Sequence, residues 1–193
     1  AADSNVTWSG TYVTLYTDNY LRWHHGEDIA QTLKSRLDQA KLSISNVVKS
    51  APSVDFGLQI FNYDNGDADN SANGGRVVFG IKELDTTNQA AFLTLLNDEL
   101  KANTWTPLCE SLYEAYNYFA GKSVDYGDDD KNVGWDNYTK NEPARDEAIE
   151  SSGTYITPFS KCNGKAYVIL ITDGEPTFDN GADSKIEAIT TEV

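Results

Sequence analysis

The feature that most constrains this chain is an apolar run near its C-terminal end, within the sequence KAYVILITDGEP at 165–176. Residues 166–172 are almost wholly apolar, as in a strand that is covered on both faces. Such a strand lies in the middle of a sheet with helices packed on both sides. The run ends at Asp173 and a glycine, so it would place a carboxylate at the carboxyl end of a central strand.

Patterns typical of one helix and one hairpin occur in the first half of the chain. A long amphipathic helix is predicted over 26–51, and Pro52 ends it. Two strands, 54–64 and 76–84, follow with only a polar turn between them, so we expect them to pair antiparallel. The inward-facing residues of the helix recur at three- and four-residue spacing: Ile29, Leu33, Leu37, Ala40, Ile44 and Val47.

Two further helices are predicted between this hairpin and the apolar run. The first covers 86–100, with Thr86 or Thr87 as its N-cap. The second has Pro107 at its first helical position, and Gly121 stops it. The residues expected to face inward are Phe92, Leu95, Leu96 and Leu100 in the first helix and Leu108, Leu112, Ala115, Tyr116 and Phe119 in the second.

The alternation of helices and strands predicts an α/β sandwich with a mostly parallel sheet and one antiparallel hairpin. A strand or extended segment is expected at 11–17, and a final helix near Ser184. Residues 122–160 have weak periodicity and are rich in acidic and aromatic side chains, which favours an inserted surface loop. We expect residues 1–193 to form one domain and to be part of a longer protein.

The charge of the chain limits its partners. Thirty acidic residues against fifteen basic ones give a formal net charge of −15. Nucleic acids and anionic membranes bind clustered Lys and Arg, so neither is expected as a partner. No segment approaches the roughly 20 apolar residues that a membrane-spanning helix needs. The acidic composition instead suits cation binding and an extracellular location.

The predicted sheet brings two oxygen-bearing residues to one edge. Asp173 follows the apolar strand, and the loop that carries Thr106 should open at the same edge. Carboxylate and hydroxyl oxygens are ligands for Mg²⁺, Mn²⁺ or Ca²⁺. The alternative is structural, because Asp-Gly is a common turn and Thr106 could simply cap the following helix.

A second cation site is suggested by the sequence DDDKNVGWD within the predicted insertion. Its oxygen donors occupy positions 1, 3, 5 and 9 of a calcium-binding loop. Position 12 is Thr139 where the pattern has Glu, so the match is partial. The four donors are Asp128, Asp130, Asn132 and Asp136.

Catalytic patterns are weak in this chain. A phosphate-accepting aspartate of the dehalogenase type would need a second Asp two positions away, but Ile171 precedes Asp173 at that spacing and Glu175 follows it. The only histidines, His24 and His25, lie together in a polar stretch and suggest no nucleophile–base pair. We therefore expect the protein not to be an enzyme; use of the cation as a Lewis acid is the remaining enzymatic alternative.

The motifs TPLCESLYEAYNYF and ILITDGEPTFD, together with YTDNYLRW, resemble the von Willebrand factor A-like domain of PilY-type proteins. These are adhesion and biogenesis factors of bacterial type IV pili. The resemblance covers roughly 15–121 and 158–193. It implies a doubly wound, mostly parallel sheet with one antiparallel edge strand and helices on both faces. It also implies a metal-ion-dependent adhesion site with Thr106 and Asp173 as ligands.

The chain departs from this family in one respect. The D-x-S-x-S motif that ends the family's first strand is not present. In this fold that strand lies between the strands expected at 54–63 and 166–172, and its absence leaves backbone groups unpaired. We therefore predict that the sequence YVTLY, 12–16, fills the gap, or that a strand comes from outside the chain.

The resemblance also bears on the two cysteines. Cysteine count alone leaves a Cys109–Cys162 disulfide and two unrelated thiols equally open. An exported pilus protein passes through an oxidising periplasm, which favours the disulfide.

Two functions follow from the resemblance. One is an exported, pilus-associated adhesion or assembly domain that binds pilus subunits, minor pilins, or a host or surface ligand, through Mg²⁺ or Ca²⁺. The alternative is a purely structural interaction module of a pilus or surface assembly, whose metal site is vestigial or incomplete.

Overall fold

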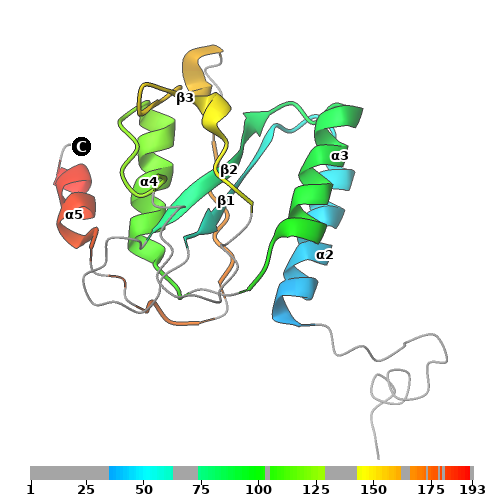
Figure 1. Ribbon diagram of the computed structural model, residues 1–193, viewed down its shortest axis with the longest axis horizontal. Helices are drawn as coiled ribbons and strands as arrows, with labels where there is room; N and C mark the ends of the chain where they lie inside the picture. The colour runs from blue at the N-terminus through cyan, green and yellow to red at the C-terminus, as the bar shows by residue number, and fades with distance from the viewer. Residues whose placement is uncertain are drawn as a thin grey trace, which may run out of the picture. The chain divides into compact units, whose positions relative to one another are not determined.

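The computed structural model (Figure 1) describes residues 35–62, 74–102, 105–128, 143–161, 166–172, 174–177, 179 and 181–191. The chain divides into two units, Ala1–Lys34 and Ser35–Val193, and every described residue belongs to the second. The described residues combine helices with two small antiparallel sheets, which is a mixed α/β fold. The predicted 11–17 strand lies outside them. Among the described residues, no helix has both the length and the apolar composition to cross a bilayer.

Helix α2, Arg36–Ser50, confirms the C-terminal part of the amphipathic helix predicted over 26–51, but it begins at Arg36 because Ser35 is its N-cap. A capping box fixes its start, because the Asp38 N–H donates to Ser35 Oγ (3.1 Å) and the Ser35 N–H donates to Asp38 Oδ2 (3.0 Å). The helix ends just before Pro52, as predicted. Near the end of the helix the buried position differs by one residue from the predicted one: Val48 is buried, whereas Val47, which was predicted to face inward, is exposed.

Strands β1, Phe56–Phe61, and β2, Gly75–Lys82, pair antiparallel and confirm the predicted hairpin. Phe61 pairs with Gly75 at the turn end and Phe56 pairs with Lys82 at the open end. The strands contribute to a core cluster with α2 and the next helix, whose buried members are Val48, Phe79, Leu84, Phe92 and Leu96.

Helix α3, Thr86–Thr94, continues as a π-helical segment, η1, Leu95–Glu99. Its N-cap is Asp85, whose Oδ1 accepts the Asn88 N–H at 2.7 Å, and not either of the threonines predicted for this role. The carboxylate at this position is better placed to accept that amide. Lys41 of α2 donates to the Leu100 carbonyl at 2.6 Å, which ties α2 to the end of η1.

Helix α4, Leu108–Ala120, buries a different face from the predicted one. Leu112 is half exposed, whereas Glu110 and Glu114 are completely buried. The helix ends at Gly121, which adopts a left-handed conformation with φ 65°, as predicted from its glycine. Burying two glutamates on one helix face lowers the stability of the fold unless their carboxylates have partners. This face of α4 is therefore a candidate site.

The segment 122–160, predicted to be a surface loop, is folded at both of its ends. Tyr126 and Tyr155 are buried, and Tyr155 belongs to a second core cluster with Val77 and Tyr118. The prediction was wrong for these ends because isolated aromatic residues bury large areas without any periodic pattern. The elements here are η3, Glu147–Ile149; β3, Glu150–Ser151; β4, Thr154–Tyr155; and η4, Pro158–Lys161.

The apolar run at 166–172 is not a buried central strand. It forms no ladder with another described strand, and its large side chains are 51% to 79% exposed. In Figure 1 it is an extended orange trace that crosses behind the hairpin in this view. The doubly wound parallel sheet is therefore not seen among the described residues. Helix α5, Asp183–Thr191, follows and confirms the final helix predicted near Ser184.

Candidate functional site

The start of α4 is joined to the chain that follows the apolar run. The Thr177 N–H donates to the Thr106 carbonyl at 3.2 Å, and the Cys109 N–H donates to Asp179 Oδ1 at 2.6 Å. The Gly181 N–H donates to Glu110 Oε1 at 2.6 Å. We call this region the α4 junction; it consists of 105–110 together with 174–177, 179 and 181.

Glu110 is the most unusual group of the α4 junction. It is fully buried, and its Oε2 has no hydrogen-bond partner among the described residues. Burial, followed by the neighbouring Asp179 carboxylate, raises the pKa of Glu110 to about 7. Two adjacent carboxyl groups of this kind are stable only when they share a proton or when a cation offsets their charge.

Thr106 is half-buried in the loop just before α4. It does not cap this helix, because Pro107 is the N-cap residue and makes no side-chain capping bond. Asp179 instead accepts an amide of the first turn, that of Cys109, from a distant part of the sequence. The structural alternative for Thr106, a simple helix cap, is therefore wrong, and its hydroxyl is not used in capping.

Asp173 lies outside the described residues. The residues on both sides of it are described, and Thr177, four positions further on, is bonded to Thr106. The α4 junction therefore holds Thr106 against Thr177, which follows Asp173 by four positions in the sequence.

The predicted calcium loop is described only at its first position, where Asp128 is exposed. Asp130, Asn132 and Asp136 lie outside the described residues. In the part of the chain that the structure describes, no three His, Cys, Asp or Glu residues are grouped as metal ligands.

Cys109 is half-buried and has no disulfide partner among the described residues. Burial raises the pKa of this thiol to about 11, and the Asp179 carboxylate adds to the effect. The thiol is therefore protonated at neutral pH and is a poor nucleophile. Cys162 lies outside the described residues, so the Cys109–Cys162 disulfide remains a prediction.

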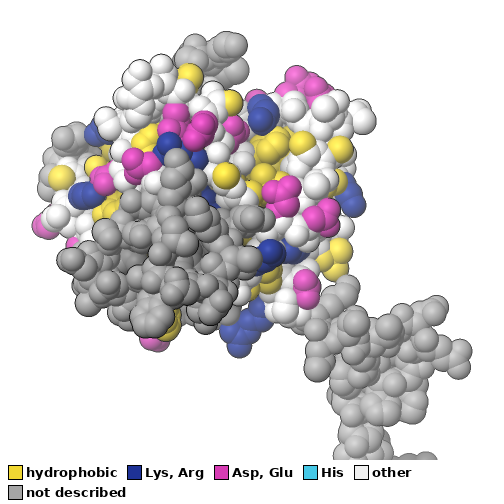
Figure 2. Space-filling view, in the orientation of Figure 1, with side chains coloured by type: hydrophobic (Ala, Val, Ile, Leu, Met, Phe, Trp, Pro, Cys, Tyr) yellow, Lys and Arg dark blue, Asp and Glu magenta, His cyan; other side chains and the backbone are white. Residues whose placement is uncertain are grey.

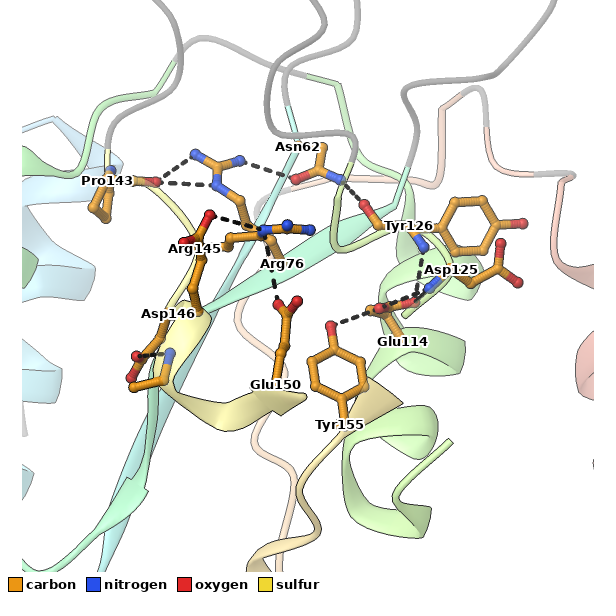
Figure 3. Close-up of polar contacts among 12 residues, drawn as sticks. Asn62, Arg76, Glu114, Asp125, Tyr126, Pro143, Arg145, Asp146, Glu150 and Tyr155 are labelled. Atoms are coloured by element: carbon orange, nitrogen blue, oxygen red, sulfur yellow. Dashed lines mark hydrogen bonds and ion pairs between the residues drawn. The ribbon is translucent and has the colours of Figure 1, made fainter. Parts of the chain in front are cut away.

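A buried polar network supports α4 one turn beyond Glu110 (Figure 3). Glu114 Oε1 accepts the Tyr155 hydroxyl at 2.6 Å, and Glu114 Oε2 accepts the Tyr126 N–H at 2.9 Å. Burial raises the pKa of Glu114, although these hydrogen bonds oppose the shift. Unlike Glu110, this carboxylate is satisfied by protein donors, so it fastens 125–126 and β4 to the helix.

Arg76 of β2 continues this network. It is fully buried and donates to the Pro143 carbonyl from Nε (3.0 Å) and from a terminal nitrogen (2.8 Å). Its other terminal nitrogen donates to Asn62 Oδ1 at 2.9 Å, and Asn62 Nδ2 donates to the Tyr126 carbonyl at 2.6 Å. Next to Tyr126, Asp125 Oδ2 forms an ion pair with Lys185 of α5 at 2.6 Å. The α4 junction is thus held on a rigid support.

Sequence reasoning missed Glu110, Glu114 and Asp179. The two glutamates are spaced i, i+4 on α4, which places both on one face, but the apolar residues of the helix favoured another face. Asp179 sits in a polar turn with no pattern of its own. Only the folded chain shows that it reaches the first turn of α4.

The visible surface gives no sign of a nucleic-acid interface. In Figure 2, the Lys and Arg side chains of the described residues on this face are scattered among acidic and hydrophobic ones. Nucleic acids bind continuous basic surfaces, so this face does not fit them.

Comparison of the chain with protein-family models, curated proteins and solved structures finds no match. The class that the structure defines is thus a mixed α/β protein with an acidic loop–helix junction.

Proposed function

We propose that this chain is an adhesion or assembly domain that binds a protein or surface partner through a divalent cation at the α4 junction. The cation is Ca²⁺ or Mg²⁺, with Thr106 and Asp173 as ligands. The resemblance to PilY-type proteins adds an extracellular, pilus-associated setting. Type IV pilus subunits, minor pilins, and a host or surface ligand are then the partners to test.

The observation that carries this proposal is the bonding of Thr106 to the chain just beyond Asp173. The hydrogen bond from Thr177 holds the loop before α4 against the segment after the apolar run. Hard oxygen donors on two such loops are the ligands that Ca²⁺ and Mg²⁺ select.

The two carboxylates beside Thr106 give further support. Glu110 Oε2 is buried without a hydrogen-bond partner among the described residues, and Asp179 lies close enough to raise the pKa of Glu110. A cation nearby would offset this negative charge, which otherwise requires a proton at neutral pH. Glu110 and Asp179 would act as neighbours of the ion or as additional ligands.

The ion would work by keeping one coordination position open. A carboxylate from the partner fills that position, so the partner's affinity depends on the ion. With a net charge of −15, the protein repels acidic partners when the ion is absent. Binding would therefore be switched by the concentration of the cation.

Thermal unfolding with and without Ca²⁺ or Mg²⁺ tests the site. A ligand at 100 times its dissociation constant stabilises the folded state by about 2.7 kcal/mol. We expect this gain in the unaltered chain and expect Asp173→Ala and Thr106→Val to lose it. Glu187→Gln, an exposed acid on α5, is the matched control and should keep it.

Two other outcomes would contradict the proposed site. If Asp173→Ala keeps the gain and Asp128→Asn loses it, the ion binds at 128–136. If neither ion stabilises the unaltered chain, the structural interaction module is the better description.

A further inference from the structure

The exposed apolar run at 166–172 has the properties of a strand that lacks a neighbour. Tyr167 and Ile169 are 79% and 78% exposed, whereas Val168 and Leu170 are 53% and 54% exposed. These four residues alternate as in an extended strand, and the alternation ends at Ile171, which is 51% exposed. All five large side chains are therefore at least half exposed, and Tyr167 and Ile169 are the most open to solvent.

The backbone of this run is also unpaired within the described part of the chain. No described residue shares a backbone hydrogen bond with 167–171. A run of exposed, unpaired, apolar backbone is a template for pairing with another strand.

The same protein protects its other strand edge with specific side chains. On β2, the Gly80 N–H donates to Asp146 Oδ2 at 2.9 Å and the Ile81 N–H donates to the Tyr118 hydroxyl at 2.9 Å. The Asp146 N–H in turn donates to the Val77 carbonyl at 2.8 Å. Residues 166–172 contain no charge, no proline and no such cap. They therefore lack the charges and the proline that commonly prevent an edge from pairing.

We propose that residues 166–172 accept a β-strand from another protein chain, by strand addition. The partner segment is extended and apolar, since its side chains must cover those of Tyr167 and Ile169. It carries Lys or Arg at the end that meets the α4 junction, because the run leads there into the exposed Glu175 and the half-buried Asp179.

A second copy of this chain fits the site less well. Each copy carries a net charge of −15, so pairing two copies brings like charges together. A basic-flanked strand meets attraction at the same place. Strand addition needs no cation, so this inference and the proposed function can fail independently.

A labelled peptide tests the inference directly on the full chain. The probe is Lys-Lys-Val-Thr-Val-Ile-Val-Thr-Lys-Lys, measured by fluorescence anisotropy and by hydrogen exchange of the 167–171 amides. We expect saturable binding together with at least tenfold slower exchange of these amides. A peptide with proline in place of its isoleucine cannot continue a ladder and should bind at least tenfold more weakly.

Variants of the chain locate the binding. Ile169→Pro and Ile169→Asp should each weaken binding at least tenfold. Their melting temperatures should stay unchanged, because this side chain is largely in solvent. Leu42→Asp, at an exposed leucine of α2, is the matched control and should bind the probe as the unaltered chain does.

Several results would overturn the inference. The probe does not bind, or Ile169→Pro binds it equally well. A probe with Glu in place of its lysines binds as tightly, which would contradict the proposed basic end of the partner. Protection of the 167–171 amides in the chain without probe would mean that the chain itself fills the site. Sedimentation would then show whether it does so within a monomer or in a concentration-dependent dimer.

Discussion

The β1–β2 hairpin and the run at 166–172 have similar strand-forming sequences but different environments. Valine, isoleucine and aromatic residues predominate in both. In the hairpin, Val77, Val78 and Phe79 are buried and every strand residue has a partner in register or beside a bulge. In the run, five large apolar side chains are exposed. Strand composition therefore indicates what a segment can bury, and the available neighbour decides whether it does so.

The origin of the neighbour explains this difference. β1 and β2 are consecutive strands joined by residues 62–74, so each supplies the other's hydrogen bonds within one stretch of sequence. Loop-closure entropy grows only slowly with length, so a connection of this size is tolerated in the hairpin. Helices α2 and α3 then cover the hairpin on one side (Figure 1) through Val48 and Phe92. Among the described residues the run has no such sequence neighbour, and in our proposal its pairing partner comes from another chain.

The largest expected effect is the difference in unfolding free energy when one aromatic side chain in each region is truncated to alanine. Phe92 is 1% exposed, and its ring meets Phe79 edge to face at 5.2 Å. Phe92→Ala should lower the free energy of unfolding by about 3–5 kcal/mol, through lost burial and a cavity. Tyr167→Ala, in the run, should change it by less than about 0.5 kcal/mol. Urea unfolding measures both, and equal costs would show that the run is buried in solution.

The second effect concerns the junction into which the run leads. Glu110 titrates near 4.5 when unfolded and at about 7 when folded, because burial and Asp179 raise its pKa. The folded state therefore binds more protons between these values, and its stability falls as pH rises through that window. The loss is on the order of 2–3 kcal/mol between pH 4.5 and 8.

Glu110→Gln checks this sign, since glutamine keeps the acceptor for the Gly181 amide and does not titrate. We expect the variant to lose most of the fall in stability between pH 4.5 and 8, as measured by urea unfolding at several pH values without divalent ions. Glu187→Gln on α5 provides the control and should leave the fall in place. An unchanged profile in Glu110→Gln would assign the pH dependence to another group.

Sequence patterns predicted the elements better than their surroundings. The hairpin, the C-terminal end of α2 and the glycine stop of α4 follow from local rules and were confirmed. The face of α4 was not predictable, because Glu114 is buried only through donors from 125–126 and Tyr155, far along the chain. Of the candidate site, Thr106 could be placed at the right loop, but Asp179 could not, since its role depends on a tertiary contact.

A third prediction converts part of the hairpin into an unprotected edge. Asp146→Ala removes the acceptor of the Gly80 amide and an ion pair with Lys82 at 3.7 Å. The cost should be about 1–2 kcal/mol, mainly from the unsatisfied amide. Hydrogen exchange of the Gly80 amide should become faster and approach that of the 167–171 amides. Asp146→Asn keeps an acceptor and should show a smaller change; equal losses in both variants would point to the ion pair instead.

The smallest expected effect lies within the run itself. Leu170 is 54% exposed and Ile169 is 78% exposed, so truncating each to alanine compares the stability contributions of neighbouring side chains on opposite sides of the run. Leu170→Ala should cost about 1 kcal/mol, from the apolar area that the rest of the fold covers, and Ile169→Ala less than about 0.5 kcal/mol. Urea unfolding at matched protein concentration measures the difference. When the strand probe is bound, the loss of unfolding free energy in Ile169→Ala should rise towards that in Leu170→Ala, because the added strand buries the open face. Equal losses without the probe would mean that the run has no defined faces.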